Sequence, residues 1–192
     1  GIAGGLEYTI SDLEGASVNV PLVHTSPVSV STDVDWLTAT FNTATDEIEV
    51  VAESNDEEED RVGHVLFETG VISDELTITQ TAMVFNLSST SVGMNNKGGS
   101  QEITIEHSKD ITVETSADWI TATFNESTSV LTIEVPENTG NPRLGSVAVT
   151  SAKTTKTISV SQFEFESAVY GDYLLIYYDM SAKDWYYYEA EM

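Results

Sequence analysis

One eight-residue stretch occurs twice in this chain and limits how it can fold. The copies are residues 35–42, Asp-Trp-Leu-Thr-Ala-Thr-Phe-Asn, and residues 118–125, which differ only in having Ile120 where the first copy has Leu37. In a chain of 192 residues, such a repeat predicts two copies of one module, each of about 80 residues. A module of that size buries roughly 60–65% of its unfolded surface, enough for a core without cross-links. The chain has no cysteine, so the apolar core must stabilise each module without disulfide bonds.

Apolar side chains recur at every second position in short segments separated by turn residues. Residues 18–23, 28–31 and 38–41 are examples, and each copy contains seven such segments. A period of two is typical of half-buried strands, and no stretch has the period of an amphipathic helix. We therefore predict an all-β fold with two sandwich modules in tandem.

The two copies stay in register over most of their length. Asn55 matches Asn138 at an offset of 83 residues, and Arg61 matches Arg143 at an offset of 82, as one deletion in a loop would produce. The connection between the copies is only a few residues long, which predicts a restricted, end-to-end pair. The predicted division is module 1 at residues 1–82, module 2 at 83–162 and a tail at 163–192.

The charge is strongly acidic and unevenly distributed. The chain has 32 acidic and 7 basic residues, a formal net charge of −25, and residues 1–82 hold 17 of the acids but a single basic residue. Such a surface repels phosphate backbones and anionic lipids, so we expect no binding to nucleic acid or to a membrane surface. No apolar run approaches the roughly 18–20 residues that span a bilayer. Neutral ligands, cationic partners and bridging divalent ions are compatible with this charge. As partners we expect a neutral glycan or a surface protein.

The tail differs in composition from both modules. It holds seven of the eight tyrosines and one of the three tryptophans, and its two apolar runs, residues 173–178 and 185–188, predict a β-hairpin. An isolated hairpin is marginal in water, so it should pack on module 2, pair with another chain or begin a third domain. Rigid amphipathic rings suit ligand contacts as well as packing. The candidate ligand-binding residues are Tyr177, Tyr178, Trp185, Tyr186, Tyr187 and Tyr188.

The repeated residues form an ordered set of motifs. Each copy has Ser/Thr-x-x-Asp-Trp followed by Leu or Ile, then a loop asparagine, then Arg-x-Gly-x-Val, then a closing strand that ends in glutamine. In the first copy these are residues 32–37, Asn55, residues 61–65 and residues 77–80. In the second they are residues 115–120, Asn138, residues 143–147 and residues 159–162.

This order of motifs resembles the BACON domain, the Bacteroidetes-associated, carbohydrate-binding, often N-terminal module. The resemblance covers about residues 25–162 and leaves the tail outside. It implies immunoglobulin-like sandwiches on an exported surface lipoprotein of a Gram-negative bacterium, with a role around glycans as a spacer or as a binding module. The chain begins with Gly1 rather than Met, and we expect an upstream segment to have been removed.

Two residue pairs at matching positions have both a structural and a functional interpretation. Trp36 and Trp119 could stack on a sugar ring, but their place beside alternating strands favours buried core residues that close the end of each sandwich. Arg61 and Arg143, the only arginines, could donate to a ligand. Their identical placement instead favours guanidinium groups that hold a loop or lie on an aromatic face.

The densest acidic run, residues 53–60, is a weak calcium candidate. Asp56, Glu57, Glu58 and Asp60 supply the hard oxygen ligands that Ca²⁺ prefers. The run lacks the spacing of an EF-hand loop, and its counterpart in module 2 is nearly uncharged, so a solvated loop is the favoured interpretation. The three histidines have no metal-ligand spacing either, and we expect no cofactor.

No catalytic motif is present in the sequence, and we expect no enzyme activity. The favoured hypothesis is a non-catalytic, cell-surface spacer or adhesion protein. The alternative is a carbohydrate-binding protein that uses exposed aromatic residues on a neutral polysaccharide or a mucin-type glycan.

Overall fold

The computed structural model describes residues 6–163, 169–170, 173–179 and 184–189, and these form strands, turns and loops without a helix. The all-β prediction is therefore confirmed for this part of the chain. No helix within these ranges is long and apolar enough to cross a membrane.

Module 1 consists of two sheets that face each other. One sheet has the strand order β1-β7-β6-β3 and the other β2-β5-β4. β1 pairs with β7 in parallel, and the other pairs are antiparallel. The strands are β1 (Glu7–Ile10), β2 (Ala16–Pro21), β3 (Val28–Thr32), β4 (Leu37–Asn42), β5 (Glu47–Ala52), β6 (Arg61–Thr69) and β7 (Ile72–Gln80).

Module 2 repeats this arrangement and adds one strand, β8, at its start. Its sheets have the orders β11-β14-β15-β9 and β12-β13-β10-β8, with β9 parallel to β15 as β1 is to β7. The strands are β8 (Phe85–Leu87), β9 (Ser91–Asn95), β10 (Gly99–His107), β11 (Ile111–Thr115), β12 (Thr121–Asn125), β13 (Val130–Val135), β14 (Arg143–Ser151) and β15 (Thr154–Phe163).

Each module has its own apolar core between its two sheets. The alternating positions of the sequence supply it: Val20, Ile48 and Ile78 in module 1 are completely buried, as are Ile103 and Leu131 in module 2. Two facing, largely antiparallel sheets around one core make each module an immunoglobulin-like sandwich, as the resemblance implies. The two modules are thus a tandem repeat in structure as well as in sequence.

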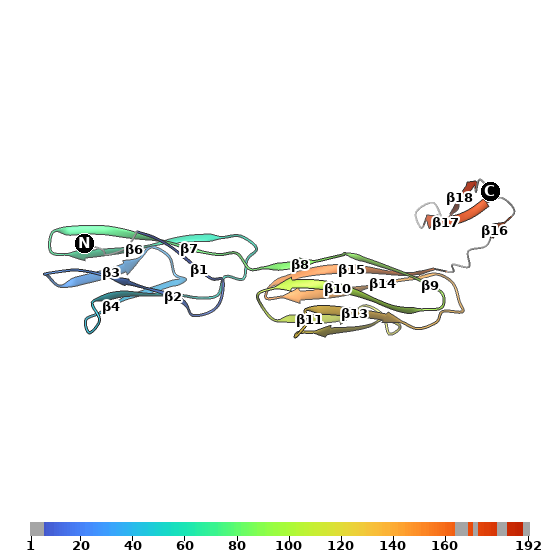
Figure 1. Cartoon of the computed structure of the whole chain (residues 1–192), viewed down its shortest axis with the longest axis horizontal. Coiled ribbons are helices and arrows are strands. Elements are labelled where there is room, and N and C mark those ends of the chain that lie inside the picture. The colour runs from blue at the N-terminus through green and yellow to red at the C-terminus, as the bar shows by residue number, and fades with distance from the viewer. Residues whose placement is uncertain (1–5, 164–168, 171–172, 180–183, 190–192) are drawn as a thin grey trace.

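The two modules lie one after the other along the long axis of the molecule (Figure 1). The chain passes from β7 directly into β8, and the connecting residues are anchored. Met83 and Phe85 are buried in the core of module 2. The Met83 N–H donates to the Glu57 carbonyl at 2.8 Å. The connection therefore belongs to both modules and is not a free tether.

The part of the tail that the structure describes forms three strands, which pair with one another. They are β16 (Val169–Tyr170), β17 (Tyr173–Asp179) and β18 (Asp184–Glu189), and β17 is antiparallel to both of the others. The β17–β18 pairing is that of the hairpin predicted from the two apolar runs.

Candidate functional site

The paired tryptophans lie at the edge of each core, where β3 leads to β4 and β11 to β12. Trp36 and Trp119 are partly exposed and pack against the buried clusters, while their neighbours Leu37 and Ile120 are fully buried. A guanidinium group lies over each indole ring. The Cζ atoms of Arg61 and Arg143 are each 4.3 Å from the ring centroid. This is cation–π geometry, and it covers one face of each ring.

Each arginine is held by a buried glutamine at the end of the closing strand. Arg61 Nε donates to Gln80 Oε1 at 2.8 Å, and Arg143 Nε donates to Gln162 Oε1 at the same distance. Both glutamines are completely buried. Gln162 Nε2 donates in turn to the carbonyl oxygens of Asn95 and Pro136, at 3.0 and 2.9 Å. All polar positions of the amide are thus used within the module.

The glycine of the Arg-x-Gly motif makes room for the indole ring. A Cβ atom at Gly145 would lie 2.5 Å from Ile120 Cδ1 and 3.1 Å from Trp119 Cζ2. At Gly63 it would lie 2.5 Å from Val34 Cγ2. Only glycine lets the tryptophan and its neighbours approach the strand this closely.

Together these residues form a structural network that closes the same end of each module. The network is the same in both copies, and the arginine and glutamine side chains donate to and accept from groups of their own module. Arg61 Nη2 also donates to the carbonyls of Glu53 and Ser54, at 2.8 and 3.0 Å. The arginines therefore hold a loop and lie on an aromatic face, the role that the sequence favours. The sequence interpretation missed the glutamine and glycine roles, although both residues recur in register in the two copies.

An open groove lies beside Trp119 in module 2. Its volume is about 510 Å³. It combines an indole edge with two carboxylates and two hydroxyls, groups that suit a polar, uncharged ligand. Its lining residues are Gly99, Ser100, Asp118, Trp119, Thr121, Glu134, Val135 and Pro136. Glu134 corresponds to Val51 in module 1, so the carboxylate pair is specific to module 2.

The acidic run at residues 53–60 does not gather its carboxylates around one point. Asp56 accepts a hydrogen bond from Ser54 Oγ at 2.6 Å, Glu58 accepts one from Lys156 Nζ at 2.6 Å, and Asp60 accepts one from the Ala82 N–H at 2.7 Å. Within the described ranges, no group of three or more His, Cys, Asp or Glu side chains is placed to hold a metal ion. The run contacts module 2 instead, which the sequence interpretation missed.

The histidines each have a neighbour that stabilises a turn or a strand end. His64 Nδ1 lies 2.8 Å from Asp33 Oδ2, and the His64 N–H donates to Asp33 Oδ1 at 2.7 Å. The hydrogen bond to the Asp33 carboxylate raises the pKa of His64, and the hydrogen bond that Asp33 accepts from the His64 side chain lowers the pKa of Asp33. In module 2, Ser116 Oγ accepts from the Ser146 N–H in the same place. Because a serine takes the place of the carboxylate in module 2 and accepts the equivalent backbone hydrogen bond, we infer that this contact has a structural role at the end of the strand.

The predicted ligand-binding residues of the tail lie on β17 and β18, but their side chains are outside the described part of the structure. They are Tyr177, Tyr178, Trp185, Tyr186, Tyr187 and Tyr188. Their role as a ligand surface stays a prediction from the sequence.

Comparison with known proteins identifies the modules. The model of the BACON family, described as "Putative binding domain, N-terminal", matches residues 26–81 and 109–163, more than half of the chain. No curated protein matches the chain.

Solved structures show a more distant likeness. A Bacteroides ovatus GH5 xyloglucanase in complex with a XXXG heptasaccharide is 19% identical over 49% of this chain and 21% of the enzyme, with a TM-score of 0.40. An I-band fragment of titin is 11% identical over 82% of this chain and 62% of the fragment, with a TM-score of 0.39. This chain therefore covers less than two thirds of the length of the xyloglucanase and of the titin fragment.

Proposed function

Because the chain belongs to the BACON domain family, we propose that it is a non-catalytic spacer or adhesion segment of a glycan-associated lipoprotein at the cell surface. The observation that supports this is the direction of the chain through the two modules. The chain enters module 1 through β1 and passes into module 2 between β7 and β8. It leaves module 2 through β15, at the end farthest from module 1 (Figure 1). Whatever is joined to the two ends is held apart by the length of both sandwiches.

The separation is set by strand length. The longest strands have nine residues in module 1 and ten in module 2, and a strand rises about 3.3 Å per residue, so each sandwich is about 30 Å long. Two in line give at least about 60 Å. An acidic surface favours this role, because like charge keeps neighbouring copies and anionic surfaces apart.

Two measurements on the whole chain test the spacer proposal. Small-angle X-ray scattering should give an elongated particle, and an array of neutral plant, host and mucin glycans should retain none of the protein. A compact particle would overturn the proposal. Retention on a glycan would shift the assignment to the second candidate.

The second candidate is binding of a neutral glycan in the groove beside Trp119. The paired carboxylates of Asp118 and Glu134, next to an aromatic edge, favour this ligand class because they can accept hydrogen bonds from sugar hydroxyls. In affinity electrophoresis with the retaining glycan, Glu134→Ala should lose most of the retardation. Glu126→Ala is the matched control, since that side chain is exposed in a turn outside the groove. Equal retardation of both variants would exclude the groove.

A further inference from the structure

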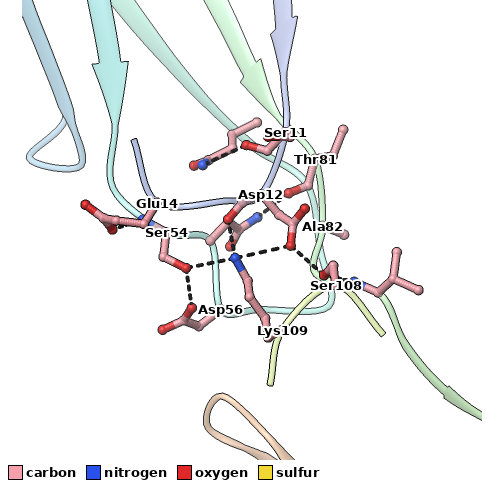
Figure 2. Close-up of polar contacts among 12 residues, drawn as sticks. Ser11, Asp12, Glu14, Ser54, Asp56, Thr81, Ala82, Ser108 and Lys109 are labelled. Carbon is pink, nitrogen blue, oxygen red and sulfur yellow. Dashed lines mark hydrogen bonds and ion pairs between the residues drawn. The ribbon is translucent and has the colours of Figure 1, made fainter. Parts of the chain in front are cut away.

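The end of module 1 that faces module 2 is acidic, and the facing surface of module 2 carries lysines. Figure 2 shows the centre of the contact, where Lys109 of module 2 reaches the turn that contains Asp12 of module 1. We propose that these groups form an ionic clasp that fixes the orientation of the two modules. The clasp comprises Asp12, Ser54 and Glu58 of module 1 and Ser108, Lys109 and Lys156 of module 2.

The centre of the clasp is buried and fully hydrogen-bonded. The side chains of Lys109 and Asp12 are only 13% and 9% exposed. Lys109 Nζ donates to the Asp12 carbonyl and to Ser54 Oγ at 2.9 Å, and it lies 3.2 Å from Asp12 Oδ2. Ser108 Oγ donates to Asp12 Oδ2 at 2.5 Å. All these groups are satisfied only in this relative placement of the modules.

A buried ion pair of this kind selects an orientation more than it adds stability. Taking two charges out of water carries a penalty that their attraction only offsets when the geometry is good. Any other docking of the modules would leave a buried charge without its partner or would separate the two surfaces. The pair therefore discriminates between orientations even where its net contribution is small.

A second contact sits beside the first and is more exposed. Lys156 Nζ donates to Glu58 Oε1 at 2.6 Å and to the carbonyl of Phe85, and it lies 4.8 Å from the centre of the Phe85 ring. Phe85 is in β8, directly after the crossing. Two contacts at different points on the same interface resist rotation about the chain, which a single contact would allow.

The clasp residues are departures from the repeat. The hydrogen-bond pattern aligns Asp12 with Asn96, since each carbonyl accepts from the loop asparagine of its own module. Lys109 aligns with Ser26 at the offset of 83, and Lys156 aligns with Asp74 at the offset of 82. The core network is common to both modules, but the charged residues of the clasp occur only on the two surfaces that meet.

The distribution of charge also indicates that the surfaces of the clasp are specialised for contact between the modules. Residues 1–82 carry a net charge of −16 and residues 83–162 a net charge of −3, so the modules as wholes repel. Module 2 has four lysines, and three of them, Lys109, Lys153 and Lys156, form ion pairs with module 1. The fourth, Lys97, has none among the described residues. Positive charge is concentrated where it opposes the acidic end of module 1.

A distance measurement between spin labels tests the clasp in the whole chain. Thr40→Cys and Thr123→Cys place one label on each module, at equivalent exposed positions of β4 and β12, and the chain has no other cysteine. Double electron–electron resonance should give one narrow distance peak. Lys109→Met combined with Lys156→Met should remove that peak and give a broad distribution.

Lys97→Met is the control, because it makes the same type of substitution and removes one positive charge at an exposed position outside the clasp. It should keep the narrow peak. A narrow peak at the unchanged distance in the doubly substituted chain would overturn the proposal. If that chain fails to fold, as judged from the indole N–H resonances of Trp36 and Trp119, the more exposed pair supplies the test. Glu58→Gln should then broaden the peak, and no broadening would refute the clasp.

Discussion

The amide of Gln162 offers the most direct test of the network that closes module 2. Gln162→Met keeps the length of the side chain and removes its polar atoms. It removes the Gln162 donor from the carbonyl oxygens of Asn95 and Pro136, which keep one other donor each, the Gly98 N–H at 3.1 Å and Arg143 Nη2 at 3.3 Å. It also removes the acceptor for Arg143 Nε. The substitution therefore changes hydrogen bonding with little change in volume.

The magnitude follows from these three bonds. Each of the two neutral hydrogen bonds that are lost contributes about 0.5–1.5 kcal/mol, and the bond from the charged guanidinium contributes about 1.5–3 kcal/mol. The additional apolar surface of methionine offsets about 1–2 kcal/mol of the loss. We expect module 2 to lose about 3 kcal/mol, which in a module of about 80 residues lowers Tm by about 12–24 °C.

Urea unfolding of the whole chain measures this, with the indole N–H resonance of Trp119 reporting on module 2 and that of Trp36 on module 1. Gln101→Met is the matched control, because Gln101 is exposed and donates one bond to the Gly93 carbonyl. It should change stability by no more than about 0.5 kcal/mol. Equal losses for the two variants would show that the buried amide does not hold the network, and the reasoning would fail.

Other predictions follow from the same contacts. Gly145→Ala forces a Cβ into Ile120 and should cost about 1–3 kcal/mol, whereas Gly93→Ala, which meets only Ser161 Oγ at 3.5 Å, should be near neutral in thermal melts. Asp33→Ser should lower the pKa of His64 toward its ordinary value in an NMR titration. Because the folded pKa of His64 is raised, this contact stabilises fully below about pH 6.5 and is lost as pH rises through the folded pKa, so wild-type and variant melts should converge there. An unchanged His64 pKa would contradict this. Millimolar Ca²⁺ should leave Tm unchanged, since the carboxylates of Asp56, Glu58 and Asp60 accept hydrogen bonds from three different protein groups; a rise of several degrees would restore the calcium hypothesis.

The architecture could be predicted because it depends on local patterns that occur twice. Alternating apolar residues such as Ile48 and Val50 identify strands wherever one face is buried, and both are completely buried here. The repeat adds a constraint that one copy lacks, because a position that is apolar in both copies is far more informative than a single apolar residue. The parallel pairing of β1 with β7 was not predicted, since nothing local distinguishes it from an antiparallel edge.

The network around the tryptophans was predicted only in part. The matching positions of Arg61 and Arg143 suggested a structural role. The structure adds the two partners of each guanidinium group, an indole ring and a glutamine amide. Gln80 and Gln162 were visible as the repeated ends of the closing strands, but an amide at a strand end does not show by itself that it is buried. Its role depends on which backbone carbonyls the fold brings next to it, and these come from segments far apart in the chain.

The clasp was missed for a different reason, and the reason suggests how to find such contacts. Asp12 and Lys109 are 97 residues apart, and a single pairing among 32 acids has no signature in a sequence. The informative comparison is between the copies. Positions shared by both modules report on the core, whereas positions where the two differ in charge report on what each module alone must contact. Lysines that appear only in module 2, at the end nearest module 1, therefore point to the surface between the modules. The same comparison should locate contacts between other repeated domains.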